Sequence, residues 1–169
     1  NTAEIDKSWP GHIWAAFGAP GYVALAYWVA SLFAGQIREA QSSFPFLEIV
    51  GEPGSGKTTL IQFLWKLFGR DYEGFDPSKS TAAGRMRTFT QVSNFPIVLI
   101  ESDRETKTGS NAHVKSFDWD ELKDAYNGRS VRTTGVRTSG NETYDPPFRA
   151  SSVISQNNQV QASQAIMER

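Results

Sequence analysis

The sequence predicts an α/β fold in which a parallel sheet is flanked by helices. Short apolar runs that suit strands alternate along the chain with segments that suit helices. One of these runs leads through a glycine-rich turn into an amphipathic helix, and another, Ile97–Ile100, is continuously apolar, as in a strand buried on both faces. Because parallel strands end at a common edge, we expect ligands to bind there.

Composition narrows the possible functions. The 169 residues carry 17 Lys and Arg against 18 Asp and Glu, a net charge of −1, which argues against a protein that coats nucleic acid by charge alone. The chain has no cysteine, so thiolate catalysis and disulfides are excluded. His12 and His113 lie far apart in the sequence and do not suggest a zinc site. Any metal is therefore expected to be a hard cation bound through oxygen.

The stretch from Ile13 to Ile37 has no charged residue and is long enough to be considered as a membrane span. Gly18-Ala19-Pro20-Gly21 interrupts it, and the remainder is shorter than the ~20 residues that a spanning helix needs. We therefore expect a buried helix and no membrane partner. The stretch lacks a basic leader and a small-residue cleavage site, so we expect a cytoplasmic protein.

The predicted elements follow from apolar spacing and from turn residues. We expect helices at 22–40, 58–68, 81–93 and 119–127, strands at 46–50, 97–100 and 148–155, and a β-hairpin over 130–144. Residues 1–42 are interpreted as a helical lead-in. Residues 43–169 are interpreted as the α/β core, truncated at its C-terminus, where a lid would follow.

The most specific motif is a phosphate-binding loop placed between a predicted strand and a predicted helix. It comprises Gly51, Glu52, Pro53, Gly54, Ser55, Gly56, Lys57 and Thr58, followed by Thr59. Small residues let backbone N–H groups close around a phosphate at a helix N-terminus, where the helix dipole favours negative charge. We expect Lys57 to contact the β and γ phosphates of ATP and Thr58 to ligate Mg²⁺.

Polar residues follow two other predicted strands. Glu101 and Asp103 come after Ile97–Ile100, where an acid would hold Mg²⁺ and another would orient the attacking water. We assign Glu101 to the metal and Asp103 to the water, although the sequence does not decide which acid has which role. Asn157 follows the last strand and would contact the γ phosphate; turn formation is the alternative explanation for this asparagine.

The order of these features along the chain resembles that of superfamily 3 helicases. The features are the phosphate-binding loop, the strand followed by Glu101 and Asp103, the basic hairpin, and the last strand followed by Asn157. These proteins belong with AAA+-like ATPases. The chain looks most like the helicase domains attached to primases in phages, plasmids and mobile elements, and the resemblance covers about residues 46–169. It implies a P-loop NTPase fold with a basic β-hairpin before the last strand.

The same resemblance implies roles for arginines. Arg129, Arg132 and Arg137 of the hairpin would line a central channel and bind single-stranded DNA through its phosphates. An equal alternative is that the hairpin is exposed and that its charged side chains keep its edge strands from pairing with other strands. Arg169 would enter the ATP site of a neighbouring subunit, so the protein would form a homo-oligomer, expected to be a ring.

The function expected from these features is Mg²⁺-dependent ATP hydrolysis that powers translocation on DNA or its unwinding, as in a replicative helicase or primase-helicase. Two alternatives remain. One is a P-loop phosphotransferase, for which residues 104–116 would serve as a lid. The other is an ATP-dependent switch or assembly module, because Ser102 separates the two acids and a misplaced acid would slow hydrolysis.

Overall fold

The structure is a computed structural model that describes residues 6–72, 74–100, 117–131, 134–135, 143–159 and 162–168. Its elements combine α-helices, short 3₁₀ turns and strands. In chain order they are α1 (Trp9–Ser31), α2 (Ala34–Gln41), β1 (Leu47–Val50), α3 (Lys57–Leu67), η1 (Pro77–Lys79), α4 (Ala82–Gln91), β2 (Ser93–Ile100), η2 (Trp119–Leu122), η3 (Ala125–Asn127), β3 (Thr134–Gly135), β4 (Thr143–Tyr144), β5 (Arg149–Gln156) and α5 (Gln164–Met167).

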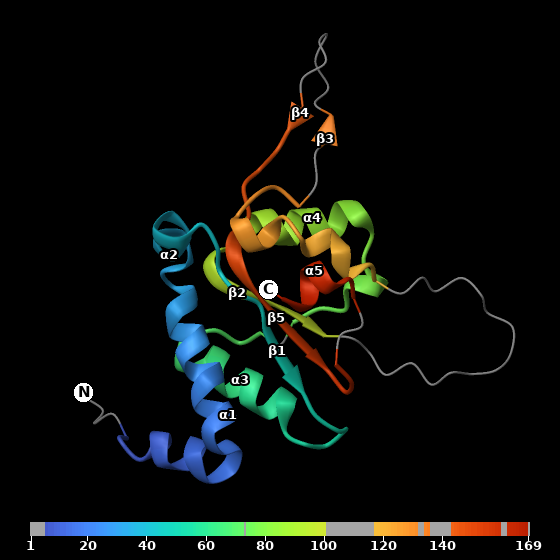
Figure 1. Ribbon diagram of the computed structural model, residues 1–169. Coiled ribbons are helices and arrows are strands. Elements are labelled where there is room, and N and C mark those ends of the chain that lie inside the picture. Colours follow the sequence, from blue (N-terminus) through green and yellow to red (C-terminus); the bar gives the residue numbers. More distant parts are fainter. Residues whose placement is uncertain are drawn as a thin grey trace, which may run out of the picture.

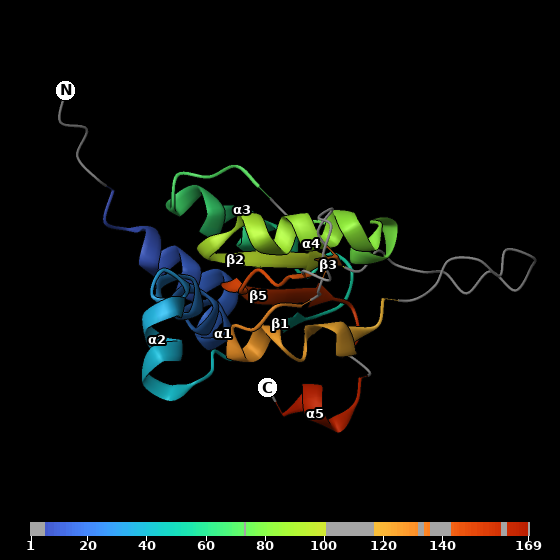
Figure 2. The same cartoon turned by 90° about the horizontal axis from the view of Figure 1, so that it is seen from above.

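Three parallel strands form the sheet, in the order β1-β5-β2 (Figures 1 and 2). The last strand in sequence, β5, is therefore the central one. Val50 lies opposite Gln156 and Ile100 opposite Ser155, so all three strands end at the same edge. The predicted class, a mixed α/β fold with a parallel sheet flanked by helices, is confirmed at this level.

Side chains alternate between the two faces of the sheet and enter two cores. Val98 and Val153 pack with side chains of α1 and α3, whereas Leu99 and Ile154 pack with side chains of α4, η2 and α5. Figure 1 shows α1 and α3 on one side of the sheet and α4 and α5 on the other. Since α1 shares a core with β2 and β5, the lead-in packs as part of the same body as the sheet.

The N-terminal region forms two helices where the sequence analysis predicted one over 22–40. The first, α1, begins at Trp9 and bends sharply at Gly18, whose φ of 57° and ψ of −147° are not helical. It ends at Ser31, whose hydroxyl donates to the carbonyl of Trp28 at 2.6 Å, a local bond that competes with helix continuation. Phe33 then leaves helical geometry before α2 starts.

By length and composition, α1 could cross a membrane, and 28% of its most apolar window is buried in the fold. One face, which includes Tyr27 and Trp28, is buried. Other side chains of α1 are exposed to solvent, and the exposed fraction is 58% for Trp14 and 59% for Val23. The expected buried helix is therefore buried along one face only.

Three further predictions are refined by the structure. The helix expected over 119–127 is instead two 3₁₀ turns, η2 and η3, separated at Lys123 and Asp124. The predicted hairpin has an antiparallel pair, with Thr134 opposite Tyr144, which confirms the hairpin in the part described. In α3, Leu60, Ile61 and Leu64 are buried, as the helical spacing of apolar residues over 58–68 predicts, whereas Trp65 is also buried and Leu67 is exposed.

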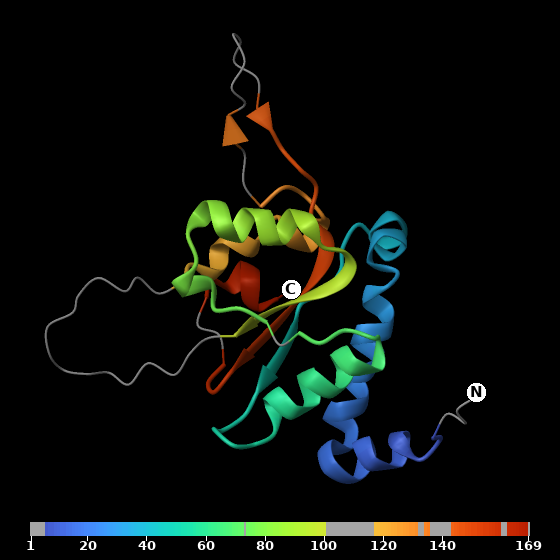
Figure 3. The same ribbon diagram turned by 180° about the vertical axis from the view of Figure 1, so that it is seen from behind.

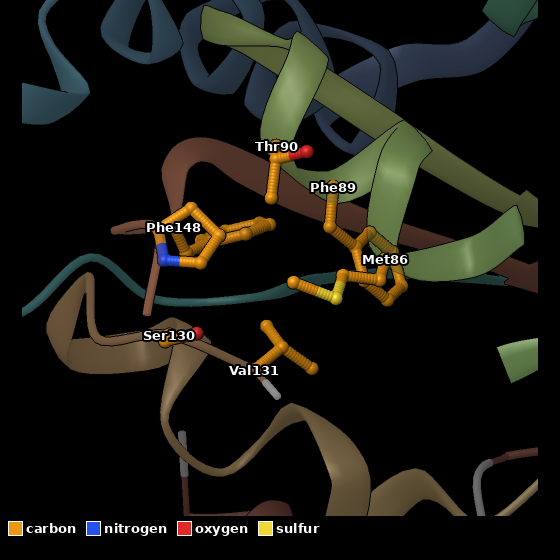
Figure 4. Close-up of a pocket in the computed structure, with 7 residues that line it drawn as sticks. Met86, Phe89, Thr90, Ser130, Val131 and Phe148 are labelled. Atoms are coloured by element: carbon orange, nitrogen blue, oxygen red, sulfur yellow. The ribbon is translucent and has the colours of Figure 1, made fainter. Parts of the chain in front are cut away.

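A small apolar pocket lies at the base of the hairpin (Figure 4). Its volume is about 10 Å³, room for one water molecule at most, so it does not hold a nucleotide. Its walls come from α4, from the segment before β3 and from the segment that leads into β5. The lining residues are Met86, Phe89, Thr90, Ser130, Val131, Pro146 and Phe148.

Arg38 joins α2 to η3 and to the start of β5. Its guanidinium donates to four backbone carbonyls, at 2.7 Å to Ala150, 3.1 Å to Ala125 and 3.4 Å to both Tyr126 and Phe148. The group also lies over the Phe148 ring, 5.4 Å from its centroid. Burial lowers the pKa of Arg38. No carboxylate in the described ranges forms a salt bridge with it, so carbonyl dipoles and aromatic faces balance its charge.

Replacing Arg38 with methionine should lower the free energy of unfolding by about 3 kcal/mol, because four carbonyls would lose a charged donor. Urea unfolding followed by circular dichroism measures the change. Arg87→Met, at an exposed position of α4, is the matched control and should change stability by less than about 0.5 kcal/mol. Equal effects of the two substitutions would show that Arg38 does not join these elements.

Candidate functional site

The candidate site is the glycine-rich loop, residues 51–56, which connects β1 to α3. Gly54 and Gly56 adopt φ values of 80° and 88°, in the left-handed region where a Cβ is strained. At Gly51 a Cβ would lie 2.7 Å from the Ser55 hydroxyl oxygen, so a side chain at this position would displace the Ser55 hydroxyl. The backbone N–H of Ser55 donates to the carbonyl of Glu52 at 3.1 Å and closes the turn.

The loop delivers the chain into the N-terminus of α3. Gly56 is the N-cap residue, and no side chain caps this end of the helix. The first intrahelical bond runs from the N–H of Leu60 to the carbonyl of Gly56 at 2.9 Å. The N–H groups of Lys57, Thr58 and Thr59 therefore precede the helical hydrogen-bond ladder, where the helix dipole favours an anion.

Lys57 is the centre of this site. Its ammonium group donates to the carbonyls of Gly51 and Glu52, the latter at 2.9 Å, and to the side-chain oxygen of Asn157, also at 2.9 Å. Asn157 directly follows β5, one hundred residues later in the chain. The structure thus brings together Lys57 and Asn157, which the sequence analysis proposed as separate parts of one site.

Strand pairing explains why Asn157 reaches Lys57. Because β5 lies beside β1, with Gln156 opposite Val50, the two strands deliver Asn157 and the start of the loop to one place. The Gln156 amide donates to the Glu48 carboxylate at 2.8 Å, and the N–H of Gly51 donates to the Gln156 carbonyl at 3.4 Å. Sequence reasoning missed Glu48 and Gln156, because no motif marks a side-chain bond between neighbouring strands.

The first half of α1 also reaches the loop, which the sequence did not predict. A Cβ built on Gly56 would lie 3.1 Å from a ring carbon of Phe17. Trp9 packs against Phe63 of α3, with 6.1 Å between ring centroids. The sequence analysis expects a buried helix only after the break at residues 18–21, so it assigned no role to Phe17.

The other predicted site residues have different positions. Thr58 and Thr59 are exposed on the first turn of α3, and Arg129 is exposed at the stem of the hairpin. Glu101, Asp103, Arg132, Arg137 and Arg169 lie outside the described residues. Within the described ranges, no group of three or more His, Asp or Glu side chains could hold a metal.

Although Glu101 lies outside the described residues, the strand before it is placed. Ile100, the last residue of β2, lies opposite Ser155 on the central strand. Asn157 follows only two residues later. The chain therefore leaves β2 at the sheet edge that carries Lys57 and Asn157.

No family model, no curated protein and no solved structure matches this chain. The assignment of a function therefore depends on the residues themselves and on their geometry.

Gly56→Ala should lower the free energy of unfolding by about 1 to 2 kcal/mol, because a Cβ at a φ of 88° is strained and would press on Phe17. Gly11→Ala is the matched control, since a Cβ there meets nothing within 4 Å and alanine favours the helix. Chemical unfolding of both variants measures the difference. A Gly56 variant as stable as the Gly11 variant would contradict the described loop conformation.

Proposed function

We propose that the protein binds ATP with Mg²⁺ at the glycine-rich loop and hydrolyses it, as a P-loop NTPase. One observation carries the proposal. The Lys57 ammonium is held at the mouth of the loop by two loop carbonyls and by Asn157 from the central strand.

The lysine contacts suit a group that binds phosphate. An ammonium group has three donors and no acceptor, and at this site it faces three oxygens from the loop and from Asn157. Phosphate oxygens carry more negative charge than carbonyls and would replace these partners. The loop supplies further donors, because the N–H groups of Lys57, Thr58 and Thr59 precede the α3 ladder.

The proposed hydrolysis uses residues from all three strand ends. Thr58 would ligate Mg²⁺ through its hydroxyl, and Glu101 would complete the metal shell. Asn157 lies within hydrogen-bond distance of Lys57 and would contact the γ phosphate when ATP is bound. Asp103 would orient the attacking water. Support for the roles of the two acids comes from the register of β2, which ends beside β5.

We further propose that hydrolysis powers movement along single-stranded DNA by a homo-oligomeric ring. This part depends on the resemblance to superfamily 3 helicases and on the hairpin. The β3–β4 pair and the loop between β1 and α3 lie at opposite ends of the molecule (Figure 3). Arg129, at the stem of the hairpin, is exposed. Arg132 and Arg137 follow it in the hairpin sequence. Arg169 would act in trans on a neighbouring ATP site.

Lys57→Ala should weaken Mg·ATP binding about a hundredfold, because the variant loses a charged donor to phosphate. Lys66→Ala, an exposed lysine on the same helix, is the control and should bind as the wild type does. Isothermal titration calorimetry measures both affinities. Unchanged ATP affinity in the Lys57 variant would remove the basis of the proposal.

The double substitution Arg132→Ala and Arg137→Ala should weaken binding to single-stranded DNA and reduce its salt dependence. If each arginine neutralises one phosphate, the slope of log K against log salt falls by about 1.4. Fluorescence anisotropy with a labelled oligothymidylate measures this slope, with Arg87→Ala as the control. An unaltered slope would mean that these arginines do not bind DNA phosphates. It would favour the alternative, in which their charge keeps the hairpin strands from pairing with strands of other molecules.

A further inference from the structure

The N-terminal half of α1 approaches the glycine-rich loop at Gly56. A Cβ built on this glycine would lie 3.1 Å from Phe17 Cε1 and 3.7 Å from Phe17 Cζ. The edge of the Phe17 ring thus occupies the space beside Gly56, the last residue before the helix that carries Lys57.

The bend in α1 holds Phe17 at this position. Gly18 has a non-helical backbone, so the helix changes direction immediately after Phe17. After the bend, a Cβ on Gly21 would lie 2.6 Å from Phe17 Cβ and 3.0 Å from Ile13 Cγ2, so the two halves of α1 pack closely. Trp9 packs on Phe63, which places the first half of the helix alongside α3.

We propose that Phe17 is a positioning residue of the nucleotide site, which holds the glycine-rich loop in the conformation that binds phosphate. The inference rests on the proposed ATP binding. It makes the N-terminal helix, which lies outside the loop motif, a functional part of the site.

The physical reason lies in the glycines of the loop. Gly51, Gly54 and Gly56 restrict the backbone least of all residues, so the loop has many alternative conformations when nothing packs against it. Apparent affinity falls in proportion to the fraction of molecules in the binding conformation. A ring packed on Gly56 raises this fraction before phosphate arrives. Phe17 therefore acts through the loop and does not touch the ligand.

The experiment compares Phe17→Ala and Phe17→Leu with two controls. Val23→Ala removes an exposed apolar side chain from α1. Tyr27→Phe removes a buried hydroxyl that lies 2.8 Å from the Ser152 carbonyl and 2.9 Å from the Pro45 carbonyl, so this variant loses stability away from the loop. Calorimetry measures Kd for Mg·ATP and for inorganic triphosphate, at a temperature where every variant is folded. Thermal unfolding without ligand measures stability.

Phe17→Ala should raise the Kd for both ligands by the same factor. The factor is about ten if the loop of the variant spends one-tenth of its time in the binding conformation. Phe17→Leu, which keeps an apolar side chain, should recover most of the affinity and provides the test if Phe17→Ala does not fold. Tyr27→Phe should unfold at a lower temperature yet bind both ligands as the wild type does, as should Val23→Ala.

Two results would overturn the inference while leaving ATP binding intact. In one, Phe17→Ala and Phe17→Leu bind both ligands as tightly as the wild type does. In the other, affinity falls for Mg·ATP but not for triphosphate, which would mean that Phe17 contacts the nucleoside. Failure of the wild type to bind either ligand would overturn the proposed function, and the inference with it.

Discussion

The bonds of the Lys57 ammonium are the interaction on which the proposed function depends. They join three parts of the chain at one point, since Lys57 begins α3, its carbonyl partners belong to the glycine-rich loop, and Asn157 follows the central strand. All three acceptors are neutral oxygens, which bond an ammonium group less strongly than phosphate does. The arrangement therefore leaves the loop ready to exchange carbonyl partners for an anion.

The sheet places the loop and the hairpin at opposite ends of one central strand. At its amino end, β5 follows the hairpin and is held by Arg38, whose guanidinium bonds to the Ala150 carbonyl and lies over Phe148. At its carboxyl end, Gln156 bonds to Glu48 and Asn157 to Lys57. Of the N-terminal helices, α2 contacts the amino end of β5 through Arg38, and α1 contacts the glycine-rich loop through Phe17. They stabilise the regions that the proposed motor would use.

The strands, α3 and the loop could be predicted because local patterns determine them, namely apolar runs, helical spacing and the glycine motif. Asn157 was found because it follows a strand, and parallel strands share an edge. The contacts of Phe17 and Arg38 could not be predicted, since each depends on packing between segments far apart in sequence. The break between α1 and α2 was missed because apolar composition continues across Leu32 and Phe33 while the backbone does not remain helical.

The most direct test is a crystal structure of the protein with Mg²⁺ and a non-hydrolysable ATP analogue. The proposal predicts that the β and γ phosphates lie inside residues 51–58, with the Lys57 ammonium moved from the Gly51 and Glu52 carbonyls to phosphate oxygens and Asn157 facing the γ phosphate. An empty loop at saturating analogue, or a nucleotide bound elsewhere with the Lys57 contacts unchanged, would contradict the assignment of this site to ATP.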